Sequence, residues 1–320
     1  MPMFLPEVTP EGKGDLTTLR WAVRSNGEGG FLFVNNHQRG AALPTHEEVR
    51  FSIRTPDGAL AFAEDPVTVA SGARFIWPFR IALGGGVLLE SATAQLVCRI
   101  AEDKVHTLFF AETPGVRSTF AFSDGTKRTV APGRGVALRL KGTDREIRVV
   151  VLGEADSLAL WKGGLGGRDR VVLSRADVIF DKDALHLRSE DPQSLEAWTY
   201  PPLDGVADRD GIFGKVPVGK VTPKFYQTEI GQVRDAGEPR KISLGRNKVA
   251  VAPGDADFAA AAVWKVKLPV DFDPAAADAL LRIRYQGDVA RVKIGGQLVM
   301  DDFYNGRPLE GGLSRHAEAL

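Results

Sequence analysis

Short runs of alternating hydrophobic and polar residues recur along the chain. Residues 50–54 (RFSIR) and 137–141 (ALRLK) alternate one by one. Because successive side chains of a β-strand point to opposite faces, each run predicts a strand with one core face and one solvent face. Other runs rich in β-branched and aromatic residues lie at 19–23, 30–35, 67–69, 75–81, 91–99, 104–111, 117–121, 146–152, 171–174 and 177–181. The pattern predicts an all-β fold with antiparallel sheets.

Glycine and proline punctuate these runs. The chain has 35 glycines and 19 prolines, and Pro56-Asp-Gly, Ser123-Asp-Gly and Pro132-Gly stand between expected strands. Glycine supplies the positive φ that tight turns need, so each of these sequences predicts a turn. Helical signals are few. Residues 155–161 are compatible with one short helix, and residues 273–278, which begin Asp-Pro, predict a short helix or a turn.

A change in composition divides the chain. Between Arg188 and Lys224 the sequence is rich in proline, glycine and aspartate. We predict an antiparallel β-sandwich domain over residues 1–187, a linker or irregular segment over 188–224, and a second β-domain over 225–320. Strands of the second part are expected around 225–232, 241–244, 261–268, 280–285, 289–294 and 297–300. A closed sandwich needs more strands, so we expect the second domain to be incomplete and the chain to continue from an upstream segment.

Charge and hydrophobicity exclude two classes of partner. Lysine and arginine number 41, and aspartate and glutamate also number 41, so no positive excess is available for a phosphate backbone and no nucleic acid partner is expected. No stretch approaches the roughly 20 apolar residues of a membrane span, so no membrane association is expected. The N-terminus lacks a basic region and contains Pro2 and Pro6, so no secretory signal is expected, and the compartment stays open.

Residue types used in covalent, metal or nucleotide chemistry are scattered. Cys98 lies in an apolar run and is expected to be buried. Asp204, Asp208 and Asp210 lack the spacing of a calcium-binding EF-hand and predict a solvated turn. The run Gly163-Gly-Leu-Gly-Gly lacks the Lys-Ser/Thr of a phosphate-binding loop and predicts another turn. No metal or cofactor is expected, because the histidines do not recur at metal-ligand spacing: His37, His46, His106, His186 and His316.

A Glu-Glu pair and an Asp-Asp pair are candidates for paired carboxylates. Glycoside hydrolysis by a retaining enzyme needs two carboxyl groups about 5 Å apart. Glu47-Glu48 and Asp301-Asp302 are neighbours in sequence, but neighbours on a strand point to opposite faces. Surface charge is the favoured interpretation of both pairs, and we assign no catalytic residue.

Five aromatic residues are candidates for stacking on the apolar face of a sugar ring. They are Trp77, Trp161, Trp198, Trp264 and Tyr304. Each is more often a core residue than a sugar platform, because large aromatic side chains dominate core burial. Of the five, Trp77 and Tyr304 are the carbohydrate-binding residues that we select.

Several runs resemble, in the same order, the region after the catalytic barrel of glycoside hydrolase family 35, the β-galactosidases. They are Gly30-Phe-Leu-Phe-Val-Asn-Asn-His-Gln-Arg, Phe75-Ile-Trp-Pro-Phe, Leu83-Gly-Gly-Gly, Ser91-Ala-Thr-Ala-Gln-Leu, Leu160-Trp-Lys, Gly167-Arg-Asp-Arg-Val-Val-Leu-Ser, Asp302-Phe-Tyr-Asn-Gly-Arg-Pro and Gly312-Leu. The resemblance covers residues 19–320. It departs from the family at Leu309-Glu-Gly-Gly-Leu, where an aromatic-containing stretch is expected.

The resemblance implies a function for the whole chain. Residues 225–320 would be a partial, galactose-binding-like jelly-roll domain. The family's two catalytic glutamates belong to a TIM barrel that this chain lacks, so the chain would be a non-catalytic β region. Its partner would be a catalytic barrel of the same or a companion chain, and galactosides are candidate ligands. The family is often secreted or periplasmic. Two alternatives remain open: a stand-alone carbohydrate-binding module, and an independent enzyme that uses unrecognised residues.

Overall fold

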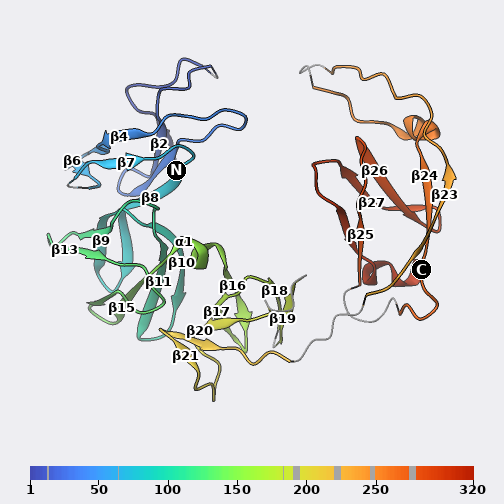
Figure 1. The fold of residues 1–320 in the computed structure, drawn as a ribbon. Helices are drawn as coiled ribbons and strands as arrows, with labels where there is room; N and C mark the ends of the chain where they lie inside the picture. Colours follow the sequence, from blue (N-terminus) through green and yellow to red (C-terminus); the bar gives the residue numbers. More distant parts are fainter. Residues whose placement is uncertain are drawn as a thin grey trace. The chain divides into compact units, whose positions relative to one another are not determined.

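The computed structural model describes residues 1–12, 14–63, 65–182, 184–189, 195–219, 225–245, 249–273 and 279–320. The chain forms two compact units, Met1–Val221 and Thr222–Leu320. Strands dominate both units, so the predicted all-β, sandwich-like class is confirmed (Figure 1). The boundary between the units falls inside the predicted 188–224 segment. The short helix or turn predicted at 273–278 lies outside the described residues, apart from Asp273.

A seven-stranded antiparallel sheet forms one layer of the first unit. Its strands, in spatial order, are β1 (Met3–Phe4), β2 (Arg20–Ser25), β3 (Gly30–Asn35), β8 (Arg74–Gly84), β9 (Val87–Ala92), β12 (Ser118–Phe122) and β13 (Lys127–Val130). In β3, Leu32 and Val34 are buried, whereas Phe31 and Phe33 are half-buried. This alternation gives the sheet a core face, as the sequence pattern predicts.

A four-stranded sheet packs against the seven-stranded sheet and completes a sandwich. Its spatial order is β10 (Gln95–Ala101), β11 (Val105–Ala111), β15 (Glu146–Leu152) and β14 (Leu138–Lys141). β11 and β15 run parallel, which departs from the antiparallel arrangement that the sequence predicts. The connection between them includes β12, β13 and β14, long enough to return the chain to the same end of the sheet.

Both faces of the four-stranded sheet are covered. Leu108 and Phe110 of β11 pack in the core shared with the seven-stranded sheet. Phe109, between them, packs in a second core with Val171 and Phe213 of a five-stranded sheet. Because both faces are buried, the strand reads as a continuous apolar run rather than an alternating one.

The five-stranded sheet has the order β16 (Leu160–Leu165), β17 (Arg168–Leu173), β20 (Trp198–Tyr200), β22 (Phe213–Lys215) and β21 (Arg209–Asp210). The short helix α1 (Glu154–Leu158) precedes it, close to the helix predicted at 155–161. A hairpin of β18 (Asp177–Asp181) and β19 (Ala184–Arg188) follows β17, and Val172, Val178, Ala197 and Val216 form a further small core.

Residues 195–216 differ from the linker or irregular segment predicted there. They contribute β20, β21 and β22, and Phe213 is completely buried. The strands are two or three residues long, and Pro201, Pro202 and Gly205 stand between them. Such short pairings leave no periodic pattern, so composition alone favours a loop.

An aromatic core fills the remaining end of the first unit. It lies between the seven-stranded sheet and two small antiparallel strand pairs, β4 (His46–Val49) with β7 (Val67–Val69), and the hairpin of β5 (Ser52–Thr55) with β6 (Gly58–Ala61). Phe51, Phe62, Phe75 and Trp77 pack there with ring centroids 4.4–6.2 Å apart. Offset and edge-on ring contacts of this kind stabilise a core beyond the area that they bury.

The second unit is built from two-stranded antiparallel pairs. They are β23 (Glu229–Arg234) with β24 (Val263–Lys267), β25 (Leu280–Ile283) with β28 (Leu309–Gly312), and β26 (Val289–Ile294) with β27 (Gln297–Phe303), accompanied by the 3-10 helices η2 (Asp255–Ala260) and η3 (Ser314–Ala319). Among its described hydrophobic residues only Leu309 and Leu313 are buried, whereas Phe225 and Trp264 are 88% and 56% exposed. A jelly-roll closure of this unit remains a prediction.

Candidate functional site

Trp77, one of the two predicted carbohydrate-binding residues, belongs to the core. Its side chain is 0% exposed and lies among Phe51, Phe62 and Phe75. Its indole Nε1 donates a 2.9 Å hydrogen bond to Oγ1 of Thr113. A ring enclosed on both faces offers no surface to a sugar, so the assignment of Trp77 to carbohydrate binding is wrong. Trp77 is buried because its side chain is on the face of β8 that the aromatic core covers, whereas the neighbouring Ile76 is 40% exposed.

Tyr304, the other predicted residue, lies at the surface. It follows β27, is 41% exposed, and meets the ring of Tyr285 edge-on with centroids 5.3 Å apart. The hydroxyl of Tyr285 donates a 2.8 Å hydrogen bond to Oδ2 of Asp302. Burial, followed by the bond to the Asp302 carboxylate, raises the pKa of Tyr285 to about 12. The cluster therefore presents an exposed ring beside a carboxylate, the chemistry that a pyranose needs for stacking and hydroxyl bonding.

The other three aromatic candidates lie in different surroundings. Trp161 is 36% exposed, and its Nε1 donates to the Ser174 carbonyl over 3.2 Å. Trp264 lies on β24 and is exposed. Trp198 lies on β20 with the Lys215 ammonium 5.2 Å from its ring centroid. The sequence alone does not show which of these three tryptophans is exposed enough to contact a ligand, because their exposure depends on which strands cover them.

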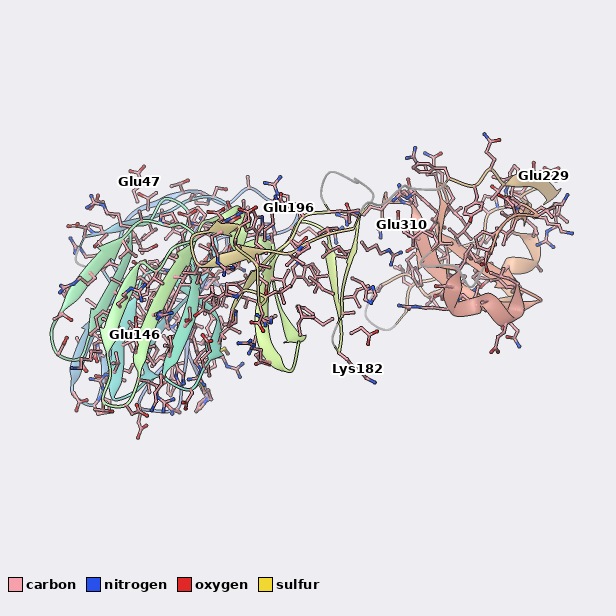
Figure 2. All side chains as sticks on the ribbon, turned by 90° about the horizontal axis from the view of Figure 1, so that it is seen from below. Glu47, Glu146, Lys182, Glu196, Glu229 and Glu310 are labelled. Carbon is pink, nitrogen blue, oxygen red and sulfur yellow. The ribbon has the colours of Figure 1, made fainter. Side chains whose placement is uncertain are left out.

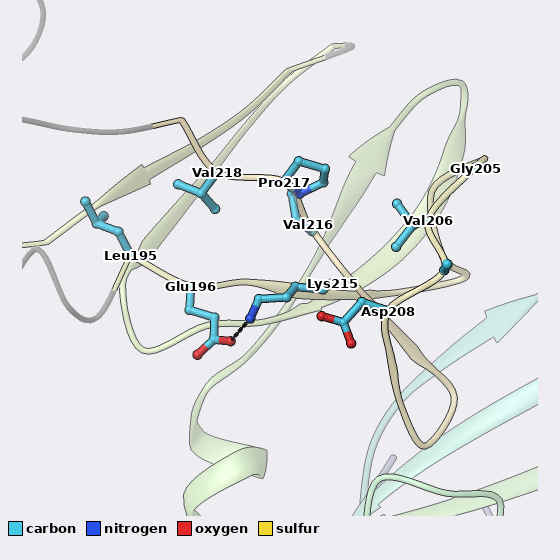
Figure 3. Close-up of a pocket in the computed structure, with 10 residues that line it drawn as sticks. Leu195, Glu196, Gly205, Val206, Asp208, Lys215, Val216, Pro217 and Val218 are labelled. Carbon is cyan, nitrogen blue, oxygen red and sulfur yellow. Dashed lines mark ion pairs between the residues drawn. The ribbon is translucent and has the colours of Figure 1, made fainter.

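A surface hollow lies beside Trp198 in the first unit. Its volume is about 620 Å³, within the usual range of roughly 300–1,000 Å³ for small-molecule sites. In the view of Figure 3, Glu196, Lys215 and Asp208 gather on one side and apolar side chains on the other. The lining residues are Leu195, Glu196, Gly205, Val206, Ala207, Asp208, Lys215, Val216, Pro217 and Val218.

An ion pair holds the polar side of this hollow. Nζ of Lys215 lies 3.0 Å from Oε1 of Glu196, and both side chains are about half exposed. The ammonium lowers the pKa of Glu196, and the carboxylate raises the pKa of Lys215. Asp208 adds a second negative charge that acts on Lys215, while its backbone carbonyl accepts a 3.0 Å bond from the Lys215 amide.

The predicted surface carboxylates are dispersed. Glu47 and Glu48 are both exposed, and Glu48 has a φ of 54°, which turns the chain there. In Figure 2, Glu47, Glu146 and Glu196 lie at three separate places on the first unit.

In the part of the chain that the structure describes, no three histidine, cysteine, aspartate or glutamate side chains are grouped to hold a metal ion. No helix among the described residues is long and apolar enough to cross a membrane.

The remaining reactive-residue candidates also have ordinary surroundings. Cys98 is half-buried against the core, and burial raises the pKa of its thiol to about 11. Asp204 is 95% exposed at the side chain and lies 3.6 Å from Arg168, which fits a solvated turn. Gly163 belongs to β16, whereas Gly166 begins the turn into β17 with a positive φ of 61°. The turn predicted for the whole run 163–167 is therefore confined to Gly166 and Gly167, and the first part of the run belongs to β16.

No protein-family model matches the chain, and no curated protein matches it either.

Proposed function

We propose that the chain is the non-catalytic β region of a β-galactosidase-like glycoside hydrolase, where it packs on a catalytic barrel. The ordered series of matching segments from Gly30 to Leu313 carries the proposal. Several of these segments supply core packing. Leu32 and Trp77, from the first two segments, are 0% exposed. A region whose matching residues are buried fits a structural role, because buried apolar residues stabilise a fold and do not contact substrate.

The carboxylates of the hollow support the non-catalytic role. A glycoside hydrolase needs one carboxyl group that keeps its proton near neutral pH and acts as the general acid. The Lys215 ammonium lowers the pKa of Glu196 and so keeps that carboxylate ionised. Asp208 is exposed to solvent.

Two measurements test the proposal. The purified chain should not hydrolyse a chromogenic β-galactoside, and it should bind a family 35 catalytic barrel prepared without its own C-terminal region. The expected readouts are no turnover by the chain alone, and a complex together with a higher unfolding temperature of the barrel when the two are mixed. A β-sandwich of similar size from an unrelated protein is the control. Turnover by the chain alone, or no complex with the barrel, would contradict the proposal.

A second candidate function is a stand-alone carbohydrate-binding module, which the exposed Tyr304 cluster favours. In that case the chain binds galactosides without a barrel. Tyr304→Ala should weaken binding of lactose by about 10-fold, whereas Tyr304→Phe keeps the ring and should change it little. Exposed apolar residues such as Phe225 and Trp264 separate the two candidates: self-association of the isolated chain favours the barrel partner, and a monomer favours the module.

A further inference from the structure

A second surface hollow lies at one end of the four-stranded sheet, apart from the hollow beside Trp198. Its volume is about 560 Å³, and Lys104 and residues 139–146 line it. Residues 139–146 run from β14 through a turn into β15, and Lys104 lies in the turn between β10 and β11. Because β11 and β15 are parallel neighbours, the two turns lie at the same end of the sheet. The hollow is large enough for a small molecule.

The lining of this hollow carries an excess of positive charge. Four basic and two acidic side chains give it a net charge of +2: Lys104, Arg139, Lys141, Arg145, Asp144 and Glu146. From outside the lining, Asp103 also acts on Arg145. Arg148 acts on Glu146, and its opposite charge offsets that of Asp103. The hollow, which we call the basic hollow, therefore favours an anion over a cation.

Both carboxylates of the basic hollow are already paired with guanidinium groups. Glu146 accepts a 3.1 Å hydrogen bond from Nε of Arg148 and a 2.7 Å hydrogen bond from Nη1 of Arg139. These bonds lower the pKa of Glu146 to about 2, so its carboxylate is ionised at neutral pH. Asp144 pairs with Arg145, and this bond lowers the pKa of Asp144. Each acid therefore repels an incoming anion less than a free carboxylate would, because a neighbouring cation offsets its charge.

Two ammonium groups of the basic hollow are left unpaired. The side chains of Lys104 and Lys141 are exposed and make no ion pair or hydrogen bond within the part of the chain that the structure describes. Lysine on an edge strand commonly prevents pairing with other chains, and β14 is an edge strand of its sheet. That role accounts for Lys141 but not for Lys104, which lies in a turn two strands away from this edge. Two free cations from separate turns that line one hollow indicate an anionic ligand.

The turn between β14 and β15 is held in place before any ligand arrives. The Thr143 amide donates to the Gly85 carbonyl over 2.8 Å, and the Gly142 amide donates to the Arg145 carbonyl over 2.9 Å. Nη1 of Arg145 donates to Nε2 of His106 over 2.7 Å, since a guanidinium can only donate. His106 is buried, so this bond fixes the position of the Arg145 guanidinium. A site that is already ordered loses less entropy when it binds a ligand.

We propose that the basic hollow binds the phosphate group of a phosphate monoester or of inorganic phosphate. A phosphate monoester carries about −1.5 to −2 charge at pH 7, which matches the two unpaired ammonium groups, whereas a carboxylate carries less. Lys104 and Lys141 bind the phosphate oxygens, and the Arg139 guanidinium, on a side chain that is 60% exposed, donates to them through its remaining N–H groups. The rest of the hollow holds the organic group of an ester. The site does not depend on the chain being part of a glycoside hydrolase.

NMR titration of the isotope-labelled full chain in phosphate-free, low-salt buffer tests the proposal. Phenyl phosphate and inorganic phosphate are the probes, and benzoate, which keeps the ring but carries a single charge, is the ligand control. We expect saturable shifts of the amide signals of Lys104 and residues 141–146 with at least one phosphate, with a dissociation constant on the order of 1 mM. Benzoate should bind more weakly than phenyl phosphate by about 5-fold or more.

Lys104→Gln and Lys141→Gln should each weaken phosphate binding by about 5-fold, because each removes one charge-assisted contact. Lys182→Gln is the matched control and should leave affinity unchanged. It makes the same change in net charge at the exposed turn between β18 and β19, which lies apart from Glu146 in Figure 2. Tighter binding of phenyl phosphate would identify an ester as the ligand, and tighter binding of inorganic phosphate would identify the free ion.

The unfolding midpoint of each variant is measured beside its affinity, so that a folding defect cannot imitate a lost contact. Absence of saturable shifts with both phosphates up to roughly 20 mM, well above a millimolar dissociation constant, would overturn the proposal. So would equal affinity of the three lysine variants, shifts confined to residues outside the lining, or benzoate binding as tight as that of phenyl phosphate. None of these outcomes bears on association with a barrel, so the two proposals fail separately.

Discussion

The indole Nε1 of Trp77 donates a 2.9 Å hydrogen bond to Oγ1 of Thr113 inside the aromatic core. Trp77 is 0% exposed and Thr113 is 3% exposed, so no water replaces either partner. The bond joins β8 of the seven-stranded sheet to the residues that follow β11 of the four-stranded sheet. It therefore ties the two layers of the sandwich at one defined point.

Thr113→Val should destabilise the chain. Valine keeps the shape of the side chain but removes the acceptor, which leaves the buried Trp77 donor unpaired at a cost of about 1–3 kcal/mol. Trp77→Phe removes the donor as well, so the double variant should lose less than the sum of the two single losses. Urea unfolding of the four proteins gives the coupling energy. If the losses of unfolding free energy in the two single variants add up to the loss in the double variant, the hydrogen bond contributes nothing. Unchanged sugar affinity in Trp77→Phe would agree with the core position of Trp77.

Asn36 should be a second sensitive position. Its buried side-chain amide donates to the carbonyls of Pro44, Val69 and Ala70 at 2.8, 3.3 and 2.9 Å, and the residue is 1% exposed. Asn36→Ala leaves those carbonyls without this donor and should lower the free energy of unfolding by about 2–4 kcal/mol. Urea unfolding measures the loss. The neighbouring Asn35→Ala is the matched control and should cost under about 1 kcal/mol, because Asn35 is exposed.

Gly163 and Gly164 offer a matched pair of substitutions in β16. A Cβ at Gly163 would lie 2.4 Å from ring atoms of Phe180, whereas a Cβ at Gly164 would meet nothing within 4 Å. Gly163→Ala should therefore cost about 1–3 kcal/mol by overpacking the ring of Phe180. Gly164→Ala should be close to neutral. Thermal unfolding compares the two, and equal midpoints would show that Phe180 moves aside freely.

The strand pattern of the first unit could be predicted because each strand has a periodic or strongly apolar sequence. The predicted strand 104–111 corresponds to β11 (Val105–Ala111), and the predicted strand 146–152 corresponds to β15. Their parallel pairing could not be predicted. A continuous run such as Leu108-Phe109-Phe110 shows that both faces are buried, but it does not show which strand lies beside it or in which direction.

The candidate site was harder to predict than the sheets. Trp77 and Tyr304 are both aromatic residues beside strand sequences, and only the surrounding layers make one buried and the other exposed. The hollow was missed because its lining comes from a segment whose prolines and glycines favour a loop. The pairing of Glu196 with Lys215 gives no signal at helical or strand spacing, since it depends on β20 lying beside β22.

The Arg134–Asp156 pair predicts how stability depends on pH. Both guanidinium nitrogens Nε and Nη2 donate to the Asp156 carboxylate at 2.7 Å, and this bond lowers the pKa of Asp156. A carboxylate whose pKa is lower in the folded state stabilises that state above its unfolded pKa of about 3.9, and the stabilisation is lost as the pH falls below that value. Asp156→Asn should therefore lower the free energy of unfolding by about 1–3 kcal/mol at pH 7. Urea unfolding at a series of pH values should show the difference from the parent protein shrinking as the pH falls below about 4. Asp177→Asn, at an exposed position, is the control and should show no such trend. If the difference for Asp156→Asn instead stays constant down to acid pH, the Arg134–Asp156 pair acts through packing rather than charge.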